Sequence, residues 1–242
     1  MIPLRDTIPS RRFPIVNVSL IALNVLVFLA EAALGEEGLY QFIAACGLVP
    51  AQFWQGGWLT RWWTPFTSMF IHAGWLHLIS NMLSLYIFGD NVEDRLGHFR
   101  YLLFYLGSGL AASAAHLVAY AGSQTPTVGA SGAIAGVLGA YLVLFPRARV
   151  VTLLPVFYFF RLVQIPAVIY LGFWFVSQLF NGFLMLAAAG SSFQGGGVAW
   201  WAHIGGFAFG FAILGVARLI TPRQPPAPPP PSYYYVDQHR RW

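Results

Sequence analysis

The run Gly129-Ala130-Ser131-Gly132-Ala133-Ile134-Ala135-Gly136 opens an apolar segment that continues to Phe145. Its glycines at 132, 136 and 139 share one face of a helix, so a neighbouring backbone can approach closely there. Ser131 lies in the first helical turn, where free N–H groups and the positive end of the helix dipole favour a developing negative charge. Two interpretations follow: a packing stripe with an incidental serine, or a serine placed for chemistry.

Composition places this segment in a membrane. Of the 242 residues, 57% are hydrophobic and 9% charged, and the mean hydropathy is +0.63. Water-soluble domains usually carry about 25% charged residues. Since several apolar stretches have spanning length and no alternating period appears, we predict an all-α polytopic membrane protein and no barrel.

Six apolar segments are long enough to be spans, at about residues 14–34, 75–89, 101–121, 129–145, 162–189 and 198–220. We therefore predict three regions: a cytoplasmic segment at 1–13, a six-helix membrane domain at 14–220, and a disordered Pro/Tyr-rich cytoplasmic tail at 221–242.

The loops between the segments allow further predictions. The first loop, residues 35–74, is long and rich in aromatic residues, so it is expected to lie against or within the outer leaflet. The apolar middle of the 147–161 loop is expected along the membrane surface. Pro166 either bends the fifth segment or marks its true start. The first segment has a cleaved signal peptide as its alternative, and a docking peptide is an alternative for the tail.

The arginines predict the orientation. If the N-terminus is cytoplasmic, the cytoplasmic segments hold twelve of the thirteen arginines, and only Arg61 faces out. The same scatter over segment ends argues against nucleic-acid binding despite a net charge of +5. We expect a bacterial plasma-membrane protein with both termini in the cytoplasm.

This topology brings polar groups to one depth. The second, fourth and sixth segments all run inward, and their polar residues lie near their starts: His77 and Asn81, Ser131, and His203. The glycine spacing after His203 matches that after Ser131, so the two helices are expected to pack closely. A serine beside a histidine, with further hydrogen-bond donors, is typical of acyl-transfer sites.

The acidic residues limit the chemistry. No Asp or Glu stands between Asp94 and Asp237, so a dyad is expected instead of a Ser-His-Asp triad from the last four segments. The chain lacks both the paired acids of an aspartyl protease and the H-E-x-x-H of a zinc protease. A metal held by His72, His77 and His116 has no acidic or thiolate support. Neither a metal nor a cofactor is expected.

These motifs together resemble the rhomboid intramembrane serine proteases of the compact six-span bacterial kind, over roughly residues 10–220. The matching elements are Gly129-Ala130-Ser131-Gly132, Ala202-His203-Ile204-Gly205-Gly206 with Gly210, His77-Leu78-Ile79-Ser80-Asn81, and Glu93-Asp94-Arg95-Leu96-Gly97.

The resemblance implies that Ser131 is the nucleophile and His203 its base, with Asn81 and His77 binding the oxyanion and Gly129 admitting substrate backbone. It further implies single-span membrane proteins as substrates, which enter sideways from the bilayer between the second and fifth spans, and a small residue before the cut.

The sequence departs from the family pattern at two positions. Thr64 follows Trp62-Trp63 where the family commonly has Trp-Arg, which puts the anchoring of the first loop in doubt. Ala135 stands where some members have a tyrosine against the histidine, so Trp200 and Trp201 become candidates for ring support. Two other functions stay open: a catalytically silent member that binds or escorts transmembrane clients, and a small-solute transporter.

Overall fold

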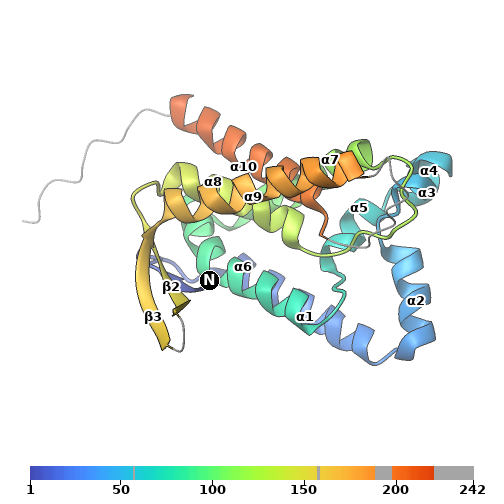
Figure 1. Ribbon diagram of the computed structural model, residues 1–242, viewed down its shortest axis with the longest axis horizontal. Helices are drawn as coiled ribbons and strands as arrows, with labels where there is room; N and C mark the ends of the chain where they lie inside the picture. The colour runs from blue at the N-terminus through green and yellow to red at the C-terminus, as the bar shows by residue number, and fades with distance from the viewer. Residues whose placement is uncertain (57, 157–158, 189–197, 221–242) are drawn as a thin grey trace, which may run out of the picture.

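The computed structural model describes residues 1–56, 58–156, 159–188 and 198–220, and it is predominantly helical, as predicted. Residues 190–197, between the fifth and sixth predicted segments, and the tail from 221 lie outside the described residues. Six long helices form the bundle in Figure 1: α1 (Ile15–Ala32), α6 (Trp75–Leu96), α7 (His98–Ala119), α8 (Ser131–Leu144), α9 (Ala167–Ala188) and α10 (Trp200–Ile220).

Four of these helices, α1, α7, α9 and α10, are long and apolar enough to cross a membrane. The other two differ in kind. α8 is apolar but has only 14 residues, or about 21 Å at 1.5 Å per residue, against a hydrocarbon core of about 30 Å. α6 has 22 residues, and its last two turns carry charged side chains beyond Gly89.

One of those charged residues, Glu93, joins three helices. The Glu93 side chain is 1% exposed, and its carboxylate accepts hydrogen bonds from the backbone N–H groups of Val16 and Asn17 at 2.9 and 2.7 Å. These N–H groups lie in the first turn of α1 and have no partner within the helix. His98 Nδ1 lies 2.5 Å from the same carboxylate. A negative group at a helix N-terminus is favourable, so Glu93 fixes the start of α1 against α6 and α7.

The expected first loop is built of short helices: α2 (Gly35–Cys46), α3 (Pro50–Gln55), α4 (Trp58–Arg61), α5 (Thr64–Thr67) and η1 (Ser68–Phe70). Arg61 donates from Nη1 to the carbonyl of Ala44 at 2.8 Å, and Thr67 Oγ1 donates to the carbonyl of Cys46 at 2.6 Å. Arg61, ahead of the Trp62-Trp63 pair, therefore ties α4 to α2.

A three-stranded antiparallel sheet is the part of the fold that the all-α prediction missed. Its order is β1 (Ile2–Asp6), β2 (Arg149–Val156) and β3 (Phe159–Pro166). Ile2 pairs with Leu153 and Arg149 with Pro166. The sheet crosses one end of the bundle, and α2, α3 and α4 lie at the opposite end (Figure 1). Since β3 ends at Pro166, this proline marks the start of α9 and does not bend it.

The N-terminal strand is joined to the bundle through Asp6. Its carboxylate accepts hydrogen bonds from the Tyr141 hydroxyl and from Asn91 Nδ2, the latter at 3.0 Å. Burial raises the pKa of Asp6 above its ordinary value, because these hydrogen bonds offset only part of the cost of removing the charge from water.

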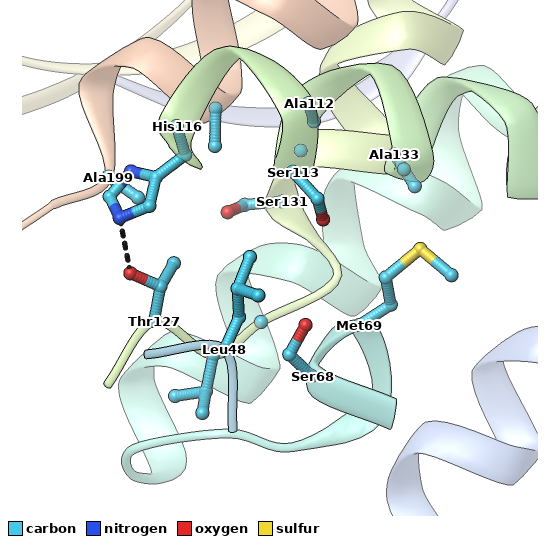
Figure 2. Close-up of a pocket in the computed structure, with 15 residues that line it drawn as sticks. Leu48, Ser68, Met69, Ala112, Ser113, His116, Thr127, Ser131, Ala133 and Ala199 are labelled. Atoms are coloured by element: carbon cyan, nitrogen blue, oxygen red, sulfur yellow. Dashed lines mark hydrogen bonds between the residues drawn. The ribbon is translucent and has the colours of Figure 1, made fainter. Parts of the chain in front are cut away.

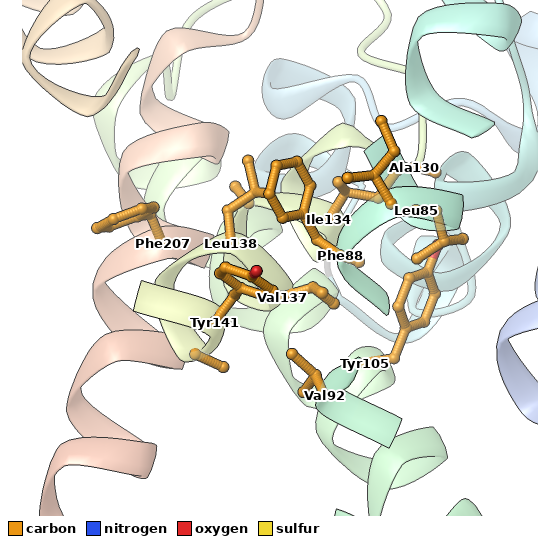
Figure 3. Packing of buried hydrophobic residues seen from close by; sticks show 14 of the residues in the cluster. Leu85, Phe88, Val92, Tyr105, Ala130, Ile134, Val137, Leu138, Tyr141 and Phe207 are labelled. Atoms are coloured by element: carbon orange, nitrogen blue, oxygen red, sulfur yellow. The ribbon is translucent and has the colours of Figure 1, made fainter. Parts of the chain in front are cut away.

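α8 is the centre of the core, with almost every side chain buried. Figure 3 shows its Ile134, Val137, Leu138 and Tyr141 packed among Leu85 and Phe88 of α6 and Phe207 of α10. Where α8 meets α10, the backbones touch. A Cβ on Gly206 would lie 2.0 Å from the Gly132 carbonyl oxygen, and one on Gly210 would lie 1.9 Å from that of Gly136. Glycine is required at this contact because no side chain fits.

Candidate active site

Ser131 is the first residue of α8, directly after a turn that only glycine adopts easily. Gly129 has a φ of +124°, and its N–H donates to the carbonyl of Ser68 at 2.8 Å. This bond holds the turn against η1. Ser131 is therefore presented at a helix N-terminus, where backbone N–H groups have no helical partner.

His203 lies in the first turn of α10 and faces Ser131. Its Nε2 is 2.7 Å from Ser131 Oγ, and the histidine is only 8% exposed. The glycine contact between α8 and α10 lies immediately below this pair, so the close approach of the two backbones sets the distance between the side chains. The structure thus brings together the two residues that the sequence predicted to meet.

His77 and Asn81 lie on the other side of the Ser131 turn. A Cβ built on Gly129 would be 2.7 Å from His77 Nε2 and 3.7 Å from Asn81 Nδ2. Asn81 Nδ2 is buried and has no hydrogen-bond partner among the described residues. Other buried side-chain atoms of the described residues also lack a partner, His116 Nδ1 among them, so the position of Asn81 Nδ2 beside Gly129 is what distinguishes it. Here it leaves an N–H group available beside Ser131.

A small cavity adjoins Ser131 (Figure 2). It is lined by Leu48, Ser68, Met69, Gly109, Ala112, Ser113, His116, Thr127, Val128, Gly129, Ser131, Gly132, Ala133, Ala199 and Ala202. The cavity has a volume of about 20 Å³, and one water molecule needs roughly 10–15 Å³. The space therefore fits one water molecule or a very small side chain.

His72, His77 and His116, the three candidate metal ligands, contact other groups in the structure. His116 Nε2 lies 2.6 Å from Thr127 Oγ1 across the cavity from Ser131 (Figure 2). The rings of His72 and His77 meet edge to face at 5.1 Å. Within the described part of the chain, no three His, Cys, Asp or Glu side chains gather as a metal site would require.

The comparison with known families decides the classification. Residues 59–219, about two thirds of the chain, match the family model of the Rhomboid domain. The chain belongs to the rhomboid family. Together with the apolar helices, this makes it an integral membrane protein.

Several rhomboid relatives align with parts of the chain. The putative rhomboid protease YdcA of Bacillus subtilis is 40% identical over 82 residues, which are 34% of this chain and 41% of that protein. Rhomboid protease GluP of the same organism is 37% identical over 122 residues, or 50% of this chain and 23% of GluP. The mitochondrial Rhomboid protein 1 of Saccharomyces cerevisiae is 34% identical over 147 residues, which are 59% of this chain and 38% of that protein. The matched region is thus less than half of each relative.

The ring of His203 in this rhomboid has two aromatic neighbours. Trp200, one of the two predicted supports, meets it edge-on at 6.4 Å, whereas Trp201 packs against Phe183. The second neighbour is Trp174 of α9, at 5.8 Å and an angle of 34°, which sequence reasoning missed.

A second missed residue contacts His203 directly. Gln178 of α9 is 4% exposed, and its Oε1 lies 2.8 Å from His203 Nδ1. The spacing of four between Trp174 and Gln178 was a usable signal, because it places both on one helix face. A glutamine in the middle of an apolar span was a further signal, since polar groups there are costly without a partner.

Proposed function

We propose that this rhomboid is a serine endopeptidase that cleaves single-span membrane proteins within or near their transmembrane segment. The observation that carries the proposal is the 2.7 Å contact between Ser131 Oγ and His203 Nε2 in a buried site. A serine hydroxyl is a weak nucleophile unless an adjacent base accepts its proton. His203 is that base in the proposed reaction.

The reaction has two halves. Ser131 Oγ attacks the peptide carbonyl while its proton passes to His203, and the resulting imidazolium protonates the leaving amine. The acyl group stays on Ser131. In the second half, His203 takes a proton from water, the hydroxide attacks the ester, and the proton returns to Ser131. General-base help of this kind is typically worth about 10²–10⁴-fold in rate.

The negative oxygen of the tetrahedral intermediate needs donors already in place. In this proposal the donors are the backbone N–H of Ser131, the free Nδ2 of Asn81 and the ring of His77, and the last two lie beside Gly129. Removal of one such donor in other serine proteases costs roughly 3–4 kcal/mol. Because Gly129 has no side chain, the ring of His77 can lie against its backbone, and the role of Gly129 in admitting substrate backbone stays a prediction.

The surroundings of the site support membrane-embedded, small-residue substrates. The cavity beside Ser131 has room for a side chain no larger than that of alanine or serine. The arginine distribution supports a cytoplasmic location of both termini, and in that orientation the end of the bundle with Ser131 and α2 faces outward, where water can enter. The α9 surface exposes Phe173, Phe180 and Phe183, as expected of a helix that faces lipid or a transmembrane substrate.

The test uses the full chain in liposomes with a single-span model substrate that carries a small residue at the cut. Wild type is expected to cleave it, and Ser131→Ala to abolish cleavage. Ser84→Ala is the matched control, because among the described residues that exposed hydroxyl bonds only within α6, to Ser80 O at 2.9 Å. Cleavage that survives Ser131→Ala refutes the proposal. A wild type that retains the substrate without cutting it supports the silent client-binding function instead.

A further inference from the structure

The buried amide of Gln178 lies behind the His203 ring, on the side away from Ser131. His203 contacts Ser131 through Nε2 at 2.7 Å and Gln178 through Nδ1 at 2.8 Å, so both ring nitrogens are engaged. Gln178 comes from α9, whereas Ser131 and His203 come from α8 and α10. Three helices therefore contribute to one line of hydrogen bonds.

The surroundings of Gln178 determine which way its amide points. Its Nε2 lies 3.1 Å from the carbonyl oxygen of Trp174 and 3.0 Å from Ser177 Oγ. The Ser177 hydroxyl donates to the same Trp174 carbonyl at 2.6 Å, so its oxygen is left as an acceptor. A carbonyl can only accept, hence the NH₂ group of Gln178 faces these two atoms and Oε1 faces the histidine.

This orientation fixes the tautomer of His203. Oε1 can only accept, so Nδ1 carries the proton and Nε2 presents its lone pair to the Ser131 hydroxyl. That is the form in which a histidine acts as a base toward serine, and a carboxylate holds it in Ser-His-Asp triads. Here no Asp or Glu stands between Asp94 and Asp237, and a neutral amide fixes the ring without burying a second charge.

We infer that Gln178 is a positioning residue, which holds His203 in the tautomer and ring orientation that the attack by Ser131 requires. The kinetic consequences of this role rest on the proposed function. The tautomer of His203 can be measured whether or not the protein is a protease.

Two substitutions separate this role from packing alone. Gln178→Met keeps the length of the side chain and removes the acceptor, and kcat/KM is expected to fall about tenfold, which corresponds to about 1.4 kcal/mol, mainly in kcat. Gln178→Glu keeps the acceptor and adds a charge that favours imidazolium. The acidic midpoint of the rate profile should then move upward by about one pH unit. Asn181→Leu on the same helix, which removes an amide that donates to the Ser177 carbonyl, is the control and should match wild type.

A purely structural role predicts a different pattern. Gln178→Met and Asn181→Leu would then lose activity only in proportion to folded protein, and this result overturns the inference. An unmoved midpoint in Gln178→Glu would show that residue 178 does not contact His203, and it overturns the inference as well. Nitrogen-15 NMR of the histidine rings gives the activity-independent readout. In wild type His203 should carry its proton on Nδ1, and Gln178→Met should show a tautomer mixture. An unchanged His203 signal in Gln178→Met contradicts the inference even if the chain proves to be no protease.

Discussion

The contact between α8 and α10 makes a quantitative prediction for Gly210→Ala. The new Cβ would lie 1.9 Å from the Gly136 carbonyl oxygen, whereas real Cβ atoms essentially never come within 3.0 Å of another atom. The helices must therefore separate by about 1.1 Å, and overpacking of this kind typically costs about 1–3 kcal/mol. Transmitted in full to the first turn of α10, that movement lengthens the His203–Ser131 contact from 2.7 to about 3.8 Å, beyond hydrogen-bond reach.

Gly215→Ala is the matched control, since a Cβ there meets no atom of the described residues within 4 Å. It should be neutral, or more stable by about 0.5–1 kcal/mol because alanine favours a helix. Unfolding of both variants by a graded denaturing detergent, alongside cleavage by each, measures the two effects. If Gly210→Ala is as stable and as active as Gly215→Ala, the argument that α8 and α10 touch through their backbones is wrong.

Three further predictions concern other parts of the chain. Because burial raises the pKa of Asp6, the folded state binds the proton of this carboxyl more tightly than the unfolded state does, and this contribution to stability is lost as pH rises from about 3.8 through the raised pKa. Thermal unfolding should therefore show wild type losing stability relative to Asp6→Asn as pH rises above about 4. A wild type that gains relative stability over that range would contradict the sign. Glu93→Ala removes the acceptor at the start of α1 and should lower the free energy of unfolding by about 1–2 kcal/mol, and Glu93→Gln should lower it by less. Equal stability of wild type and both variants would show that this cap contributes nothing. In a Cys46→Ala background, a membrane-impermeant maleimide added outside intact cells should label Tyr40→Cys at once and Arg12→Cys only after permeabilisation, and the reverse order would invert the proposed topology.

The sequence alone predicted the long helices of the bundle and the contact between Ser131 and His203. Long apolar segments can only be helices in lipid, and the alternating direction of successive spans brings the starts of three of them to one depth. The small-xxx-small spacing in two of these segments then predicted their contact. The roles of Ser131, His203, Asn81, His77 and Gly129 stay predictions, because geometry alone does not measure catalysis.

The missed features depend on pairings that local patterns do not contain. β1 pairs with residues about 150 positions later in the chain. Its sequence contains Pro3 and two charged residues and lacks the clear alternation of apolar and polar residues that would predict a strand. Gln178 and Trp174 reach His203 only because α9 packs against α10, and the order of spans does not specify which face of α9 turns inward. Short helices in the first loop are similarly defined by contacts such as that of Arg61 with Ala44.

The central claim is that Ser131 is a nucleophile activated by His203, and active-site labelling tests it most directly. The full chain in detergent is treated with a fluorophosphonate, and the adduct is located by mass spectrometry. The account predicts one adduct, on Ser131, that is absent from Ser131→Ala and from denatured protein and forms about 100-fold or more slowly in His203→Ala. An adduct on another residue, or labelling of Ser131 that proceeds equally fast without His203, would contradict it.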